Sequence, residues 1–398
     1  MTPLHNAHAT LPPPALDKDG PQPLAFDRPI QAHEHASKQL PSSDGRQAIP
    51  RYRNPKVREQ IFELACRTFD EAAVQSLLTA NQDLITPQEY YEFVGYAAFN
   101  GKNGILDLLL RLKKGNTDEY RTLLDLATRR ATVKGYIDIV RDLIEKGAPV
   151  RNHGESALHL AMMFSHREIG KLLVQAGADI EASDRYKSGA DTPLLLSIQN
   201  GDDSCLQWLL EQGANPNGRP DNKGRYPLAV ACLYGNLSKV KMLLDAGAHL
   251  DVGKKERATP LAVAVGQGHT EVGRYLIDIG ADVNAACKPR HAPLYKAVAH
   301  GRLYDLAEAL LKAGAEPDLL CGQEVEKTPL MIAVRNKNRI MAEFLVNHGA
   351  DIHRKDRKGR SSLDLAKRLK SEHIVTMLQA KLIQQADQPG SERRQAQQ

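Results

Sequence analysis

The residues best suited to chemistry in this sequence are two histidines that flank a glutamate near its start. His33, Glu34 and His35 are residue types that bind Zn²⁺, but a zinc site needs three or four converging ligands, and no third ligand is evident. We therefore interpret the cluster as incidental. No Gly-x-x-x-x-Gly-Lys-Ser/Thr loop, Gly-x-Ser-x-Gly elbow or His-Glu-x-x-His helix occurs. The sequence predicts no catalytic residue, metal or cofactor.

The cysteines do not suggest a metal or redox site either. None belongs to a Cys-x-x-Cys pair, and three fall at core positions of expected helices. A reduced cysteine at such a position behaves as a small apolar side chain. The three helix-core cysteines are Cys66, Cys205 and Cys232, and the other two are Cys287 and Cys321.

Composition limits the classes of partner. The chain has 398 residues and a formal net charge of +5, which demands neither a nucleic-acid nor a membrane partner. No run approaches the roughly 18 apolar residues that span a bilayer, and the start lacks a basic-then-apolar secretion signal. We expect a monomeric protein of the cytoplasm, or of the nucleus, without a membrane partner.

The elements that must position any functional residue are clearest in TPLAVAVGQGHTEVGRYLIDIGADVNA, residues 259–285. Thr259 can cap a helix, and Pro260 suits the first helical position. Gly268 and Gly280 stand where a helix commonly ends in the left-handed conformation. The pattern predicts two short helices. Isolated helices under about 12–15 residues are marginal in water, so this unit needs neighbours.

Copies of the unit recur along the chain. Thr-Pro-Leu returns at Thr192 and Thr328, and the mid-unit turn recurs every 30 to 36 residues. Ten units span Pro55 to Ile383. The second helix stop is a Gly-Ala pair at Gly147, Gly177, Gly213, Gly247, Gly280, Gly314 and Gly349.

The unit resembles an ankyrin repeat, strongly over residues 154–351 and more weakly at both ends. The resemblance implies an all-α repeat solenoid of stacked helix-turn-helix repeats, with hairpin-like turns along one edge and a concave face. It also implies a structural role for His159, because the family's histidine at this position makes hydrogen bonds between units. A segment of about 33 residues is too small to fold alone, so neighbouring units must bury one another's apolar faces.

Four parts follow from this pattern. Residues 1–54 are Pro-rich and poor in large apolar side chains, which predicts a disordered tail; residues 384–398 form a second one. Residues 55–383 form the array, with degenerate repeats at 55–150, regular repeats at 154–351 and a C-terminal cap at 352–383. The alternative is that residues 55–150 form a separate helical domain. The first tail is either a variable segment without a specific signal or a targeting or secretion signal.

Departures from the regular unit are informative. Ser165, Lys337 and Lys370 replace the mid-unit glycine, at about 1 kcal/mol each if the left-handed conformation is kept. Two units are three residues longer than the usual 33, with insertions expected at 183–189 and 319–324. Insertions in a solenoid collect on one edge, often the binding edge, although loop drift explains them equally well.

The resemblance also predicts a binding surface. It places the turn tips and two positions near the end of each first helix on the concave face. Apolar members of this row suit a protein interface, because large aromatic anchors carry about 2 kcal/mol or more of binding energy; the alternative is that they pack sideways onto the next unit. The predicted partner-binding residues are Met163, Phe164, Gln199, Asn200, Leu233, Tyr234, Gln267, His300, Arg335 and Asn336.

The end of the array is basic. Residues 353–370 hold eight Lys or Arg and two Asp. We interpret this segment as a solvated cap. The alternatives are a nuclear import signal, a contact with an acidic partner and a contact with nucleic acid. Nucleic acid is disfavoured because no aromatic residues for base stacking accompany the charge.

The sequence therefore predicts a non-enzymatic scaffold or adaptor that binds a protein on its concave face. The alternatives are a regulatory subunit that acts on a transcription factor or a ubiquitin-ligase client, and an effector with an unrecognised activity.

Overall fold

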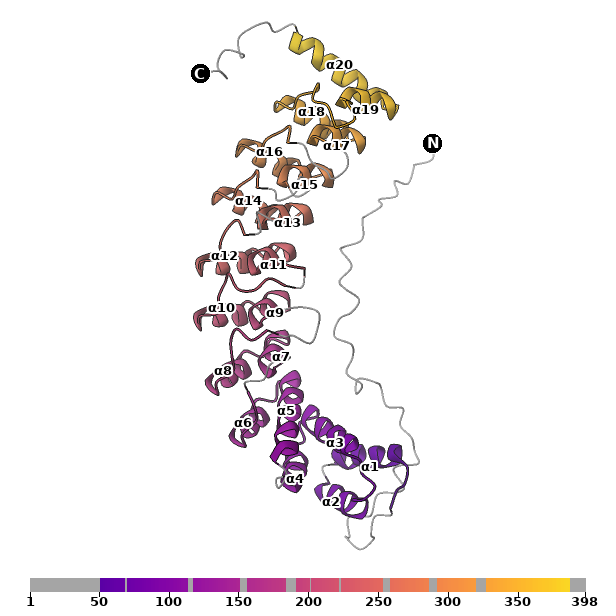
Figure 1. The fold of residues 1–398 in the computed structure, drawn as a ribbon, viewed down its shortest axis with the longest axis vertical. Helices are drawn as coiled ribbons and strands as arrows, with labels where there is room; N and C mark the ends of the chain where they lie inside the picture. The colour runs from indigo at the N-terminus through magenta and orange to yellow at the C-terminus, as the bar shows by residue number, and fades with distance from the viewer. Residues whose placement is uncertain are drawn as a thin grey trace, which may run out of the picture. The chain divides into compact units, whose positions relative to one another are not determined.

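The computed structural model describes most of the chain as helices joined by short connections (Figure 1). The described residues are 51–68, 70–113, 117–150, 156–183, 191–200, 202–221, 223–252, 258–285, 292–319 and 327–386. These ranges contain 20 α-helices and no strand, which confirms the predicted all-α class. They divide after Arg130 into two compact units.

The first unit contains two helix pairs and most of a longer fifth helix. The pair α1–α2 packs against the pair α3–α4 through α1 and α3 and through α2 and α4. The rings of Phe62 and Phe93 stack in the core of this unit, with their centroids 4.2 Å apart. The helices are α1 (Pro55–Thr68), α2 (Glu71–Ala80), α3 (Pro87–Phe99), α4 (Asn103–Lys113) and α5 (Thr117–Lys134), the last of which continues past Arg130.

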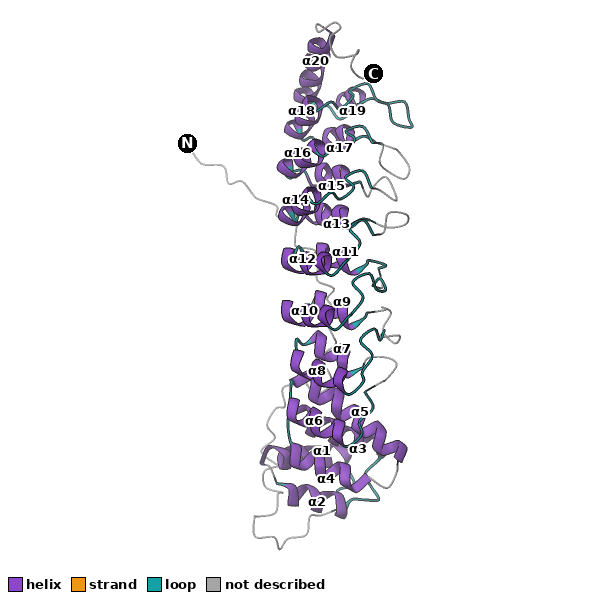
Figure 2. Cartoon of the chain, turned by 90° about the vertical axis from the view of Figure 1, so that its left-hand side faces the viewer, coloured by secondary structure: helices purple, strands orange, loops and turns teal. Residues whose placement is uncertain are grey.

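The second unit is a row of helix pairs. From α7 onward, each first helix packs against its own second helix and against the first helix of the next pair, so two parallel layers form (Figures 1 and 2). The described loops project beyond the first helices, as Figure 2 shows. The helices before the midpoint are α6 (Ile137–Glu145), α7 (Ala157–Met163), α8 (Arg167–Gln175), α9 (Pro193–Gln199), α10 (Asp203–Glu211), α11 (Pro227–Tyr234) and α12 (Leu237–Asp245). The remainder are α13 (Pro260–Gln267), α14 (Thr270–Asp278), α15 (Pro293–His300), α16 (Tyr304–Lys312), α17 (Pro329–Arg335), α18 (Arg339–Asn347), α19 (Ser362–Arg368) and α20 (Glu372–Ala386).

The helix starts follow the Thr-Pro-Leu pattern. The hydroxyl oxygens of Thr192, Thr259 and Thr328 accept hydrogen bonds from the backbone N–H three residues on, at 3.2–3.3 Å. A proline follows each at the first helical turn. Each cap satisfies a backbone donor that the helix leaves unpaired, typically worth about 1 kcal/mol.

The mid-unit turn is left-handed whether or not it holds glycine. Ser165, Lys337 and Lys370 have φ angles of 61°, 53° and 53°, and they are the only non-glycine residues with positive φ in the described part of the chain. The left-handed conformation is thus kept at the three positions where the sequence replaces the mid-unit glycine. A residue with a Cβ loses roughly 1–2 kcal/mol in this conformation.

His159 is a structural residue, as the sequence predicted. The side chain is buried, and its Nε2 lies 3.1 Å from the Ala182 carbonyl and 3.2 Å from the Asp191 carbonyl. Two acceptors require that Nε2 carry the proton, so Nδ1 accepts from the Ser156 hydroxyl at 2.8 Å.

The helix-core cysteines are free and buried. Burial raises the pKa of the Cys66 and Cys205 thiols to about 12, so neither is a thiolate at neutral pH. Cys287, Cys321 and the His33–His35 cluster lie outside the described residues. No described helix combines the length and apolar composition that a bilayer crossing requires.

Candidate functional site

The predicted row lies at the ends of the first helices of the second unit. The second residue of each predicted pair is exposed in every repeat from α7 to α17. Of the first residues, Met163, Gln199 and Leu233 are half-buried and Arg335 is exposed. The exposed second residues are Phe164, Asn200, Tyr234, Gln267, His300 and Asn336.

The apolar members of the row are partly open to solvent. Phe164 is 38% exposed and Tyr234 is 47% exposed, and both are among the large apolar side chains that the described residues leave exposed. The Phe164 ring stacks against the His166 imidazole at 6.5 Å between centroids. The imidazole therefore lies near the Phe164 ring within its own turn, and a substantial part of both aromatic side chains remains open.

Polar members of the row contact the preceding repeat, which the sequence did not indicate. The Asn336 amide donates to the Ala299 carbonyl at 3.5 Å. The His300 imidazole lies so close to Gly268 that a Cβ added there would be 3.0 Å from Nε2. His300 and Asn336 therefore help to hold successive repeats together while they face solvent.

A similar tether sits beside Tyr234. His269 Nε2 lies 2.9 Å from the Leu233 carbonyl, so this nitrogen carries the proton and donates. The imidazole also lies against Gly235, whose φ is 68°. This contact fixes the turn that presents Tyr234.

Each of two described turn tips is closed by hydrogen bonds to a buried aspartate. In the tip before α19, the buried Asp356 carboxylate accepts from the backbone N–H groups of Lys358 and Arg360 at 2.9 and 3.0 Å. The Arg360 guanidinium adds bonds at 2.7 and 3.0 Å. Asp221 makes equivalent bonds to Lys223 and Arg225 in the tip before α11.

Substituting Ala for Asp356 should destabilise the protein by about 1–3 kcal/mol at pH 7, because the turn amides and the Arg360 guanidinium lose their shared, buried acceptor. Burial pushes the pKa of Asp356 up, but hydrogen bonds from Arg360 and the turn amides outweigh burial and hold this pKa below its usual value. The stabilisation is thus present above the ordinary carboxyl pKa and is lost as pH falls through the folded-state pKa. Urea unfolding at pH 7 and pH 2 measures it. If the variant and the parent chain differ in free energy of unfolding by the same amount at pH 2 as at pH 7, this account is contradicted.

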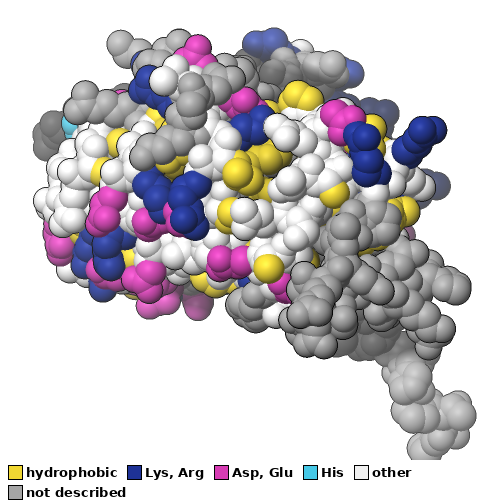
Figure 3. Space-filling view, turned by 90° about the horizontal axis from the view of Figure 1, so that it is seen from below, with side chains coloured by type: hydrophobic (Ala, Val, Ile, Leu, Met, Phe, Trp, Pro, Cys, Tyr) yellow, Lys and Arg dark blue, Asp and Glu magenta, His cyan; other side chains and the backbone are white. Residues whose placement is uncertain are grey.

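Charge is distributed unevenly over the chain. On the face that Figure 3 shows, Lys and Arg side chains alternate with Asp and Glu, and hydrophobic side chains are exposed between them. Residues 327–370, by contrast, hold twelve Lys or Arg and four Asp or Glu.

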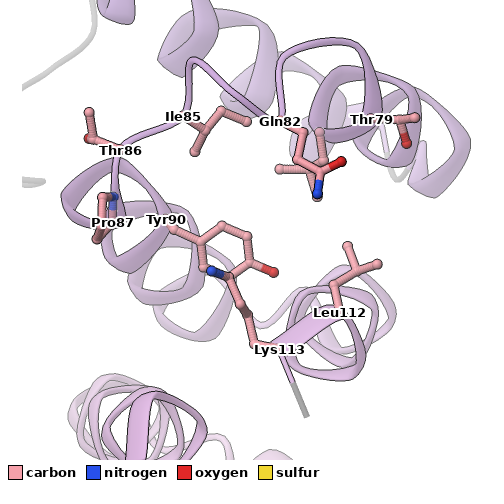
Figure 4. Close-up of a pocket in the computed structure, with 9 residues that line it drawn as sticks. Thr79, Gln82, Ile85, Thr86, Pro87, Tyr90, Leu112 and Lys113 are labelled. Carbon is pink, nitrogen blue, oxygen red and sulfur yellow. The ribbon is translucent and has the colours of Figure 1, made fainter. Parts of the chain in front are cut away.

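The first unit contains a cavity of about 290 Å³ between the end of α2, the start of α3 and the end of α4 (Figure 4). The Tyr90 hydroxyl donates to the Leu109 carbonyl at 2.7 Å, and the Lys113 ammonium lies 4.7 Å from the centre of the Tyr90 ring. Lys113 also pairs with Glu119 at 2.9 Å. Tyr90 and Lys113 thus already have partners, and the remaining walls are both polar, from Thr79, Gln82 and Thr86, and apolar. The apolar lining residues include Leu78, Ile85, Pro87 and Leu112.

The described residues contain no group of three or more His, Cys, Asp or Glu side chains arranged to hold a metal ion. The row itself presents exposed aromatic rings, amides, one imidazole and one guanidinium.

Comparison with known proteins agrees with the repeat pattern. A family profile described as "Ankyrin repeats (3 copies)" matches residues 94–184, 185–254, 248–321 and 294–388. A transient receptor potential cation channel subfamily A member 1 homologue of Caenorhabditis elegans is 32% identical over 168 residues, covering 39% of this chain and 13% of that protein.

Two further similarities cover about half of this chain. The target of rapamycin complex 2 subunit AVO2 of Saccharomyces cerevisiae is 29% identical over 196 residues, which are 46% of this chain and 45% of that protein. The chain thus spans less than half the length of either curated relative. The crystal structure of the human ASB11 ankyrin repeat domain is 29% identical and covers 57% of this chain and 97% of its own, with a TM-score of 0.48.

Proposed function

Because the chain belongs to the ankyrin-repeat family, we propose that it is a non-enzymatic scaffold or adaptor that binds a partner protein along the row at the ends of its first helices. Ankyrin repeats generally act as protein-interaction modules and not as catalysts. A relative over part of its length, AVO2, is named as the subunit of a complex.

The observation that carries the proposal is the exposure of Phe164 and Tyr234 at equivalent positions of two repeats. Exposed aromatic side chains are costly to leave in water, and they are the residues that protein interfaces use as anchors. The His269 imidazole holds the turn that presents Tyr234, and the row residues His300 and Asn336 contact the preceding repeat, so these parts of the surface are ordered before a partner arrives. An ordered surface loses less conformational entropy on binding.

The test compares proteins that are retained by the full chain with those retained by Phe164→Ala/Tyr234→Ala. Each truncation should remove about 2 kcal/mol or more of binding energy, which is at least about 30-fold in affinity. Once a retained protein is identified by mass spectrometry, titration calorimetry with the purified pair gives the dissociation constants of both forms.

The matched control is Ile279→Ala/Ile340→Ala, which removes two exposed apolar side chains, one at the C-cap of α14 and one in α18. The control should bind as tightly as the parent chain. Equal affinity for the parent and the Phe164→Ala/Tyr234→Ala variant would show that the row is not the binding surface.

A further inference from the structure

The last two repeats carry cations at three equivalent positions. One is the residue before the helix cap, the next is the last residue of the first helix, and the third is the left-handed turn. Each pair is 33 residues apart, and α17 packs directly against α19. We call this set the cation ladder; it consists of Lys327 and Arg360, Arg335 and Arg368, and Lys337 and Lys370.

Two members of the ladder occupy strained positions. Lys337 and Lys370 have φ angles of 53°, whereas the corresponding residues of the three described repeats before them are Gly235, Gly268 and Gly301. Glycine adopts this conformation without strain, so a lysine at both turns is unfavourable for folding. Backbone strain that persists at adjacent equivalent sites suggests a functional role for the side chains.

The ladder is short of acidic partners. Among the described residues, Lys327, Arg335, Lys337, Arg368 and Lys370 make no ion pair and no side-chain hydrogen bond. Arg360 pairs at 2.7 Å with Asp356, whose carboxylate is buried and fully used in the turn. The ladder therefore carries several positive charges that the described part of the chain does not neutralise.

The cations also lie near one another. Burial lowers the pKa of the Lys327 ammonium, and the charges of Arg335, Arg360 and Lys358 lower it further, outweighing the opposing effect of the Asp356 carboxylate. Mutual repulsion of this kind is relieved when an anion binds. A ligand with several negative charges in a row would gain most from this arrangement.

The spacing suggests the form of that ligand. Packed helices lie about 8–10 Å apart. An extended polyproline II segment has three residues per turn and advances about 3.1 Å per residue, so every third side chain points the same way and lies about 9 Å further along. One carboxylate in every three residues of an extended peptide would therefore meet the ladder pairs of successive repeats. Arg335 and Arg368 can each hold a carboxylate through two N–H groups.

We propose that the cation ladder binds an extended acidic segment of the partner protein, with Asp or Glu at every third residue. This inference rests on the proposed function and names the chemistry of the partner. Single-stranded nucleic acid is less suited, because binding to it uses exposed aromatic side chains for base stacking. The large apolar side chains exposed between residues 327 and 384 are Ile340 and Ile383, and neither is aromatic.

The experiment uses the full chain and a dye-labelled peptide of four Glu-Ser-Gly repeats, with a Gln-Ser-Gly peptide and an oligothymidylate as comparisons. Fluorescence anisotropy should show that the Glu peptide binds and that binding weakens steeply with added salt. Arg335→Gln/Arg368→Gln should weaken it about five- to tenfold. The control Arg141→Gln/Arg274→Gln, which removes the same charge from α6 and α14, should change it less than twofold.

The turn lysines provide a second, opposing readout. Lys337→Gly/Lys370→Gly should raise the melting temperature by about 2 °C per substitution, because strain is removed, and should weaken peptide binding about threefold. A merely structural role predicts the rise in melting temperature without any change in binding.

The proposal is overturned if the ladder and control variants bind the Glu peptide equally well, or if oligothymidylate binds more tightly than the peptide. Failure here is distinguishable from failure of the proposed function. If the Phe164→Ala/Tyr234→Ala variant no longer binds a partner protein that the ladder variants still bind, the row is part of the binding surface and the ladder is not.

Discussion

Replacing Arg58 with Met should lower the free energy of unfolding of the first unit by about 3–5 kcal/mol, because the change leaves a buried carboxylate unpaired. Arg58 is 2% exposed, and its guanidinium donates to the Glu89 carboxylate at 3.0 and 2.8 Å. It also donates to the carbonyls of Tyr52, Arg53 and Leu84. The side chain thus joins the start of the described chain to α1 and α3.

Urea unfolding with two optical signals measures this loss. Trp208 is the single tryptophan, and it lies in the second unit. Its fluorescence therefore reports that unit, whereas circular dichroism reports all helices. The variant should show a helical transition at lower urea while the fluorescence transition keeps its midpoint. A helical transition that does not move would contradict the prediction.

A double variant separates the buried charge from the lost packing. Arg58→Met/Glu89→Gln removes both charges but keeps a side-chain acceptor for the cap at Thr86, so much of the stability should return. Acid should also rescue the single variant. In the parent chain burial raises the pKa of Glu89, but hydrogen bonds from Arg58 and Thr86 outweigh burial and lower it. Without Arg58 this pKa rises, so protonation below the ordinary carboxyl pKa removes the penalty.

Replacing Trp208 with Ala should destabilise the second unit by about 3–5 kcal/mol through loss of buried area and a residual cavity. The indole on α10 is buried, and it lies against α8 where that helix has Gly170. A Cβ added at Gly170 would be 3.1 Å from the ring. The close approach of ring to backbone leaves little room for neighbours to collapse into the space.

Circular dichroism in urea is the appropriate measurement, because this variant lacks the fluorescent reporter. Trp208→Phe should lose less stability than Trp208→Ala, since the smaller ring still fills part of the volume of the indole. A loss below about 1 kcal/mol for Trp208→Ala would mean that the repeats shift to close the cavity and are less rigidly packed than the close contact at Gly170 indicates.

Local signals account for the parts of the fold that the sequence predicted. Thr259 caps its helix through a bond to an amide three residues away, and Gly268 ends that helix with a φ of 82°. Such interactions span only a few residues, so residue type and spacing are sufficient to predict them. The same argument holds for Ser165, where the period of the repeat placed a serine in a left-handed turn.

The predicted row could be foreseen only in part from local sequence patterns. The exposure of Phe164 and Tyr234 agrees with their positions in the repeat, but whether they bind a partner stays a prediction. The tether from Asn336 to Ala299 was not foreseen, because the two residues are 37 positions apart. The cation ladder could have been found in the sequence by comparing equivalent positions of successive repeats, although the charge was assigned there only to a solvated cap.

The amino-acid sequence alone determined the repeat, the caps and turns of the regular units and the class of fold, since these depend on short-range capping, turn conformation and periodic burial. Tertiary structure decided the division after Arg130, the buried pair of Arg58 with Glu89 and the bonds from the Lys239 ammonium to the Ser197 and Ile198 carbonyls. A charged residue in a helix can equally face water or a distant carbonyl. The packing of neighbouring helices selects between them, because a charge shut away from water is stable only where that packing supplies partners.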